Sequence, residues 1–172
     1  MSSIYFSARL CKLVGPGKIT PDQNSHEKSP NDWNAHLFPI YGRKCIIATN
    51  KGTLYSFVRL DIFKKDLQDL AAFFVNSLFK QLKADGLFQS KIFYEWLDSF
   101  SDLQFRRTDN DKAVIGSMND IIYQLKVAIE FRVPSLTNLT DLSAGTYVNK
   151  LIHGSLHYKT PLERIATKKN NA

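Results

Sequence analysis

Residues 35–60, AHLFPIYGRKCIIATNKGTLYSFVRL, contain the pattern that decides the fold. Apolar, aromatic and β-branched residues gather there in three short runs, as they do in β-strands. Gly42-Arg43 and Asn50-Lys51-Gly52 separate the runs with residues that hairpin turns favour. The stretch therefore predicts a three-stranded antiparallel meander, whose strands are residues 36–41, 44–49 and 53–60.

Two further strands and several helices are predicted around this meander. Residues 3–14 form an apolar run that ends at the breaker cluster Gly15-Pro16-Gly17, and residues 103–108 form a second strand-like run. Helices are expected where apolar residues recur at three- and four-residue spacing. They are predicted at 63–84, 89–100, 117–132, 139–152 and from Pro161 onward.

The order of these elements predicts an α+β fold, with an antiparallel sheet of four to five strands and helices packed on one face. A length of 172 residues fits a single domain, residues 1–172. Within it, residues 15–32 are expected to form a long polar loop, and residues 168–172 a frayed tail.

The composition is typical of a globular protein of the cytoplasm. Cys11 and Cys45 are the only cysteines, so we expect reduced thiols and no disulfide framework. Arg9 and Lys12 interrupt the first apolar run, unlike in a signal peptide, and no stretch is apolar over the length of a membrane span. A cytoplasmic protein without a membrane partner is predicted.

Basic residues outnumber acidic ones and are unevenly distributed along the chain. The net charge is +7. Residues 1–60 hold eight Lys and Arg against three Asp and Glu, residues 61–111 seven against nine, and residues 112–172 eight against four. This balance favours polyanion partners, because Lys and Arg neutralise phosphates and release their counterions. It is equally compatible with a basic protein that binds no nucleic acid.

Familiar catalytic and metal-binding motifs are absent from the sequence. There is no phosphate loop, nucleophile elbow, H-E-x-x-H or C-x-x-C. His153 and His157 have the spacing of a metal pair but no acidic or cysteine ligand nearby in sequence, so neither a metal nor a cofactor is predicted. In the expected register Cys45 lies roughly 13 Å from His36, too far for a nucleophile and its base.

Polar residues near several predicted strand ends are candidates for a ligand site. If the strand at 103–108 pairs with the meander, they meet at one end of the sheet, beside the start of the helix at 117. A helix start offers free N–H groups to an anion. Arg106 and Arg107 point to opposite faces of a strand, so at most one of them reaches this site. The ligand-binding candidates are Arg43, Asn50, Arg106, Arg107, Asn110 and Asn119.

The segment Gly116-Ser117-Met118-Asn119-Asp120 has two interpretations. In one, Ser117 and Asp120 form a capping box that only begins the helix. In the other they belong to an active site, with His36 as a general base, because the ordinary pKa of histidine lies near neutrality. His36, Ser117 and Asp120 are therefore the catalytic candidates, and both interpretations stay open at this stage.

Several short motifs together resemble a known family. They are similar to the W-x-A-x-L-F element, the T-N pair and the late G-S-M-N-D helix start of a family of uncharacterised bacterial domains. The resemblance covers residues 3–132 and implies a shared fold and a shared polar cluster, but no mechanism. Its residues here are Trp33-x-Ala35-x-Leu37-Phe38, Arg43-Lys44, Thr49-Asn50, Thr108-x-Asn110 and Gly116-Ser117-Met118-Asn119-Asp120.

Three functions are compatible with these observations. The leading hypothesis is a binding module for a polyanion such as RNA or DNA, in a mobile-element or defence context. It rests on the net charge and on Arg43, Lys44, Arg106 and Arg107, with Tyr41 and Tyr55 as exposed rings that stack bases. The second is a small enzyme whose site is the polar cluster at the sheet end, His36, Asn110, Ser117, Asn119 and Asp120. The third is a protein-interaction or antitoxin-like domain, which would expose a large apolar patch to a protein partner.

Overall fold

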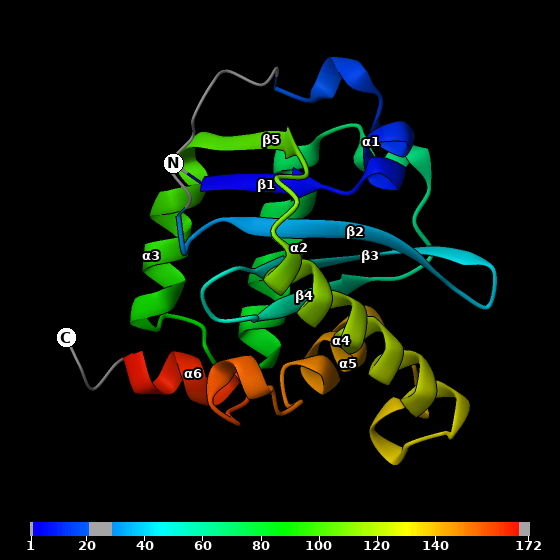
Figure 1. The fold of residues 1–172 in the computed structure, drawn as a ribbon, viewed down its shortest axis with the longest axis vertical. Coiled ribbons are helices and arrows are strands. Elements are labelled where there is room, and N and C mark those ends of the chain that lie inside the picture. The colour runs from blue at the N-terminus through cyan, green and yellow to red at the C-terminus, as the bar shows by residue number, and fades with distance from the viewer. Residues whose placement is uncertain (1, 21–28, 169–172) are drawn as a thin grey trace.

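The computed structural model describes residues 2–20 and 29–168, so residues 21–28 of the predicted loop and the predicted tail beyond residue 168 lie outside the described residues. An α+β fold is confirmed: a five-stranded sheet in the order β4-β3-β2-β1-β5 crosses the molecule, with helices around it (Figure 1).

The strands are β1 (Ser2–Phe6), β2 (Trp33–Ile40), β3 (Arg43–Asn50), β4 (Ser56–Arg59) and β5 (Leu103–Arg107). The α-helices are α1 (Ala8–Val14), α2 (Leu70–Ala84), α3 (Lys91–Ser99), α4 (Lys112–Glu130), α5 (Asp141–Val148) and α6 (Pro161–Lys168). Short 3₁₀ helices are η1 (Pro16–Lys18), η2 (Lys64–Leu67), η3 (Phe100–Asp102), η4 (Pro134–Leu136) and η5 (Gly154–Leu156).

The predicted meander is confirmed, with a shifted register. β2 pairs antiparallel with β3, and β3 with β4. The first turn comes one residue earlier than predicted, at Tyr41-Gly42, whose φ angles of 47° and 77° suit a primed hairpin turn. As a result His36 faces Ile47, and Phe38 faces Cys45.

The prediction of a purely antiparallel sheet is wrong, because β1 runs parallel to both of its neighbours, β2 and β5. The expected strand at 3–14 ends at Phe6, and Ser7 caps α1 by accepting a hydrogen bond from the N–H of Leu10. α1 lies in the connection between β1 and β2, and parallel neighbours need such a crossover connection in place of a tight turn. The apolar pattern of a short run does not by itself distinguish a strand from a buried helix.

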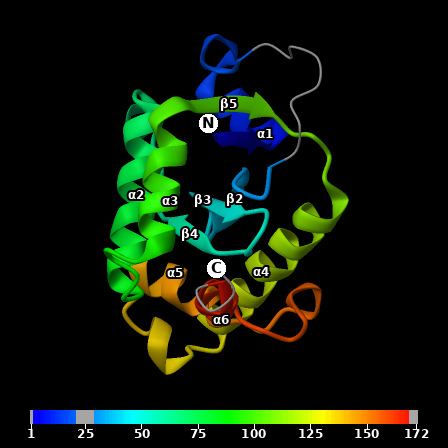
Figure 2. The same ribbon diagram turned by 90° about the vertical axis from the view of Figure 1, so that its left-hand side faces the viewer.

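Helices cover both faces of the sheet, so the prediction of one covered face is also wrong. α2 and α3 lie on one side of the sheet and α4 on the other (Figure 2). α1 joins the hydrophobic cluster of α2 and α3, whereas α5 joins that of α4. β1 is buried along its whole length, as expected of a strand with cover on both faces.

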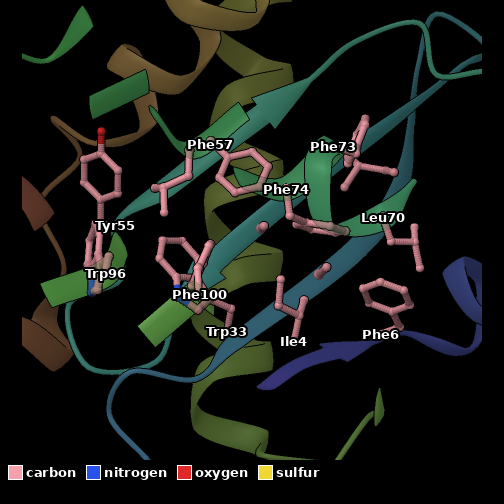
Figure 3. Packing of buried hydrophobic residues seen from close by; sticks show 14 of the residues in the cluster. Ile4, Phe6, Trp33, Tyr55, Phe57, Leu70, Phe73, Phe74, Trp96 and Phe100 are labelled. Carbon is pink, nitrogen blue, oxygen red and sulfur yellow. The ribbon is translucent and has the colours of Figure 1, made fainter. Parts of the chain in front are cut away.

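The larger hydrophobic cluster lies between the sheet and α2–α3 (Figure 3). The fully buried ring of Trp33 meets Trp96 of α3 and Phe100 edge-on, with ring centroids 5.1 and 5.9 Å away. Phe74 of α2 stacks on Phe6 of β1 at 5.6 Å. Such aromatic packing holds both helices against the sheet.

A smaller cluster holds α4 and α5 against the opposite face. Met118 and Ile121 of α4 share this cluster with Phe38 of β2 and Ile47 of β3. α5 is also joined to the sheet by polar contacts through Asn149, the residue that ends this helix. Its side chain is fully buried.

We expect Asn149→Ala to lower the free energy of unfolding by about 2–4 kcal/mol. The amide oxygen accepts a hydrogen bond from the N–H of Ser56 at 2.8 Å, and the amide nitrogen donates to the carbonyl of Ser56 at 2.8 Å and to Asp85 at 3.0 Å. The substitution leaves these buried groups without that partner. Urea denaturation measures the loss, and Asn119→Ala, on the exposed side of α4, is the control. A loss below about 0.5 kcal/mol, the size of an ordinary surface effect, would contradict this assignment.

Candidate functional site

The carboxyl ends of the parallel strands β1 and β5 meet at one end of the sheet. The loop after β1 leads into α1, in the larger cluster, whereas the loop after β5 leads into α4 on the opposite face. Loops that leave neighbouring parallel strands toward opposite faces open a crevice between them, where α/β sheets bind ligands. This end of the sheet is therefore where a site is most expected.

A cavity of about 340 Å³ lies at this crevice. Two basic side chains line it, Lys12 from α1 and Arg107 from the end of β5, together with the hydroxyl-bearing Thr108. The cavity thus combines positive charge with apolar surface. Its other lining residues are Phe6, Ala8, Cys11, Pro16 and Ile19.

Two further hollows lie along the same end of the molecule. One, of about 270 Å³, lies between α1 and η2 and is lined by Lys18, Lys64 and Lys65 among others. The other, of about 640 Å³, lies between the β2–β3 hairpin and η2, where it includes Arg43, Lys44 and Lys64. Because Lys64 lines both, the two hollows adjoin, and α1 separates them from the cavity at β1 and β5.

We name the lining of these three hollows the basic end. It contains seven Lys and Arg side chains and one acidic residue, Asp61. Asp66 lies beside them in η2, where its carboxylate accepts a hydrogen bond from the N–H of Phe63. This excess of cations attracts anions to the surface. The seven basic residues are Lys12, Lys18, Arg43, Lys44, Lys64, Lys65 and Arg107.

Most of these positive charges are not neutralised within the described residues. Arg43 pairs with Asp61 at 3.0 Å, but both side chains are exposed, so solvent screens the pair. Lys18 donates to the carbonyl oxygens of Leu67 and Gln68 at 2.7 and 2.5 Å, which leaves its charge in place. The remaining five form no ion pair with any residue that the structure describes.

Two exposed aromatic rings lie near these cations, Phe63 within the basic end and Tyr41 in a neighbouring hollow beside Arg43. Tyr41, in the hairpin turn, is 78% exposed, and Phe63, which lines the largest hollow, is 63% exposed. The ammonium group of Lys65 lies 5.8 Å from the ring centre of Phe63. Tyr55, the other predicted stacking residue, is instead fully buried and donates a hydrogen bond to Asp85. Exposed rings beside cations are typical of surfaces that bind single-stranded nucleic acid.

Of the four predicted ligand-binding residues on strands, two lie in the basic end. These are Arg43 and Arg107. Arg106 points to the opposite face of β5, as the alternation of a strand requires. It is buried, and its guanidinium donates to the hydroxyl of Ser3 at 3.2 Å and to the side-chain oxygen of Gln104 at 2.5 Å. Arg106 therefore supports the sheet in this structure.

The three predicted asparagines lie apart from one another. Asn50 is buried, and its side-chain oxygen accepts hydrogen bonds from the N–H groups of Gly52 and Thr53, which shapes the turn before β4. Asn110 precedes α4 in a left-handed conformation with a φ angle of 55°. Asn119 is exposed on α4. None of the three lines the basic end.

The predicted start of a helix at Ser117 is wrong. α4 begins at Lys112, and the side chain of Asp111 caps its first turn. Ser117 and Asp120 therefore lie inside the helix, where neither forms the predicted capping box or borders a free helix start. The S-x-x-D spacing and Gly116 suggested a helix start, but a long helix accommodates both in its interior.

The predicted catalytic residues are not joined to one another. His36, in β2, is half-buried, and the charged groups that act on it are Arg9 and Lys126. Asp120 accepts a hydrogen bond from Gln124, one turn further along α4. Among the described residues, no hydrogen bond or ion pair connects the imidazole of His36 to a carboxylate. The acid–base pair that the enzyme hypothesis requires, His36 with Asp120, is therefore not formed among the described residues.

The observed register brings Cys45 nearer to His36 than predicted. Cys45 faces Phe38, two residues from His36 along β2, which is about 7 Å. Its thiol donates to the carbonyl oxygen of Arg43 at 3.6 Å. Burial raises the pKa of the Cys45 thiol, so the group stays protonated at neutral pH and is a poor nucleophile.

Acidification is expected to destabilise the fold through His36. Burial, and then the charges of Arg9 and Lys126, lower the pKa of His36, so the unfolded chain binds more protons than the folded one below about pH 6.5. The stabilising contribution of neutral His36 is therefore lost as pH falls below that value. Burial also lowers the pKa of His153. Urea denaturation between about pH 7 and pH 5 should show a smaller fall in stability for His36→Gln than for the wild type. Equal falls would contradict the assignment.

Two kinds of site are not found in the part of the chain that the structure describes. His, Cys, Asp and Glu side chains form no group there that could hold a metal ion. None of the described helices is long and apolar enough to cross a membrane. Cys11 and Cys45 are both free thiols.

Four residues of the basic end were not predicted from the sequence as ligand-binding residues: Lys12, Lys18, Lys64 and Lys65. They come from α1, η1 and η2, and only the fold brings these segments together. Their sequence signal is the local charge, because residues 1–20 contain three basic and no acidic residues.

The fold and this surface together define a small α+β domain with one strongly basic end. The chain belongs to the family described as "Domain of unknown function (DUF6933)", whose model matches residues 3–164. The resemblance seen in the sequence is thereby confirmed. A search of curated proteins gives no match, and the family description carries no activity.

Proposed function

We propose that this domain binds single-stranded nucleic acid along the basic end. The observation that carries the proposal is the concentration of seven Lys and Arg side chains around three hollows whose combined lining contains a single acidic residue, Asp61. Cations spread over neighbouring hollows suit a chain of phosphates better than one isolated anion. Each phosphate contact releases counterions, which is the main source of such affinity.

The exposed rings favour a single strand over a duplex. Phe63 is exposed in the lining of the largest hollow, beside Lys44 and Lys64. Tyr41 is exposed in a neighbouring hollow, which shares Arg43 with the largest one. Unstacked bases of a single strand pack on such rings, and each stack contributes about 1–3 kcal/mol. The rings of paired bases are covered by their neighbours in a duplex. The proposal therefore assigns the phosphates to the cations and the bases to the rings.

Binding of a fluorescent RNA of about twelve nucleotides, within the range of site sizes for single strands, tests the proposal. If four of the seven cations contact phosphates, the logarithm of the association constant falls with the logarithm of salt concentration with a slope of about −3. Affinity then drops about 50-fold between about 50 and 200 mM salt. Fluorescence anisotropy measures this dependence. Absence of binding at the lower salt concentration, or affinity that ignores salt, would remove the proposal.

A further inference from the structure

Much of the wall of the cavity at the carboxyl ends of β1 and β5 is apolar. We propose that this cavity binds a single nucleotide unit, with the base against the apolar wall and the phosphate at Lys12 and Arg107. The inference rests on the proposed nucleic-acid function, since the two cations of the cavity belong to the same basic end. It adds a specific ligand class and a defined place for that ligand.

The size of the cavity suits one small unit. Its volume of about 340 Å³ lies at the lower limit of small-molecule sites. The cavity therefore accommodates one nucleotide and is too small for a nucleic-acid duplex. Ala8, Cys11, Pro16 and Ile19 supply the apolar part of the wall. A flat base that covers these side chains removes apolar surface from water.

The two cations converge on the cavity from different elements. Lys12 comes from α1 and Arg107 from the last position of β5. Both are exposed, and neither forms an ion pair within the described residues. A guanidinium group binds two oxygens of one phosphate, and an ammonium group adds a compact charge. The positive charge of Arg107 also acts on Cys11, where it opposes the larger effect of burial, which raises the thiol pKa. Arg107 is therefore close to the cavity wall.

Thr108 provides a polar contact for the edge of the base. Its hydroxyl oxygen accepts a hydrogen bond from the N–H of Asn110 at 3.2 Å. The hydroxyl proton remains available to donate, and nucleobases carry ring nitrogens and carbonyl oxygens that accept such bonds. The cavity thus has one place for each part of a nucleotide: an apolar wall, a hydroxyl donor and two cations.

The same chemistry can come from a free nucleoside monophosphate or from one nucleotide of a strand. Alkylation of Cys11 distinguishes them, because this thiol lines the cavity. The wild-type protein is treated with iodoacetamide at alkaline pH, and peptide mass spectrometry follows Cys11, with the buried Cys45 as internal reference. AMP, adenosine, inorganic phosphate and the RNA of about twelve nucleotides are compared as protecting ligands.

AMP at ten times its dissociation constant should slow alkylation of Cys11 about tenfold, by mass action. Adenosine and inorganic phosphate alone should protect only at much higher concentrations. Lys12→Ala and Arg107→Ala should each raise the AMP concentration needed by about tenfold, whereas Lys150→Ala, exposed outside the cavity, should not. Each variant is judged by its own ratio of rates with and without ligand, because Arg107 also affects the Cys11 pKa.

The outcomes separate this inference from the proposed function. Protection by both AMP and the RNA supports a nucleotide of the strand in the cavity. Protection by AMP without any RNA binding supports a free-nucleotide site and overturns the proposed function. RNA binding with no protection of Cys11 by RNA or AMP overturns the inference and leaves the proposed function intact. Equal protection by phosphate and AMP also overturns it, because the base then has no place in the cavity.

Discussion

The triple substitution of Lys44, Lys64 and Lys65 by Ala will weaken binding of a short single-stranded RNA about 100-fold at about 0.1 M salt. These three side chains line the two adjoining hollows beside η2 and form no ion pair within the described residues. Each phosphate contact with a single strand contributes about 0.7 to the slope of log affinity against log salt. Loss of three contacts therefore lowers the magnitude of the slope by about 2, as measured by anisotropy over a range of salt concentrations.

A matched triple variant separates a local effect from one of net charge. Lys80, Lys83 and Lys150 are exposed lysines outside the basic end, so their replacement by Ala removes the same charge from a different surface. We expect this control to change the affinity by less than about threefold, because salt screens distant charges. Equal losses in the two triple variants would show that the basic end is not the binding surface.

The second large effect concerns the fold itself: Trp33→Ala will lower the free energy of unfolding by about 3–5 kcal/mol. The Trp33 ring is fully buried and contacts Phe57, Trp96 and Phe100 with centroids 6.1, 5.1 and 5.9 Å away. Truncation removes these contacts and leaves a cavity where β2 meets α3. Urea denaturation monitored by far-UV circular dichroism measures the shift.

Trp33→Phe is the conservative control, because it retains an aromatic ring at the same position. Its cost should be about half that of Trp33→Ala, since a smaller cavity remains. A loss below about 1 kcal/mol for Trp33→Ala, the typical size for any substitution, would show that this ring does not hold α3 against the sheet.

The meander could be predicted from the sequence because hairpins are local. The turn at Tyr41-Gly42 and the apolar runs on either side of it lie within a few residues of one another. The parallel pairing of β1 joins segments that are farther apart in the chain, such as Ile4 with Trp33 of β2 and Tyr5 with Arg106 of β5. A short apolar run carries no information on which distant strand it meets, so the order and direction of the outer strands were not predictable.

The motifs that identify the family have structural roles in the fold. Trp33 and Ala35 are buried in the larger cluster, and Met118 of the G-S-M-N-D segment is buried in the smaller one. Thr49 bonds to Ser56 across two strands at 2.9 Å. Membership was predicted correctly from these residues, which pack in the core or bond across strands in this structure. They did not point to the basic end.

The basic end could be predicted only in part. Arg43 was selected as a basic residue in a predicted turn, and Arg107 as a basic residue near the end of a predicted strand. Lys12, Lys18 and Lys64 lie on short helical segments whose packing is decided by the tertiary fold. The predicted helix start at Ser117 failed for the opposite reason: a local pattern suggested a boundary, whereas the packing of Met118 and Ile121 continues the helix through it.

The most direct test of the central claim is a map of the RNA contacts by backbone amide chemical shifts. Short single-stranded RNA is titrated into the ¹⁵N-labelled protein. We predict that the largest shifts fall on the segments that form the basic end, which are residues 8–19, 42–44, 61–68 and 107–108. Shifts confined to α4 and α5, or spread evenly over the surface, would contradict the account.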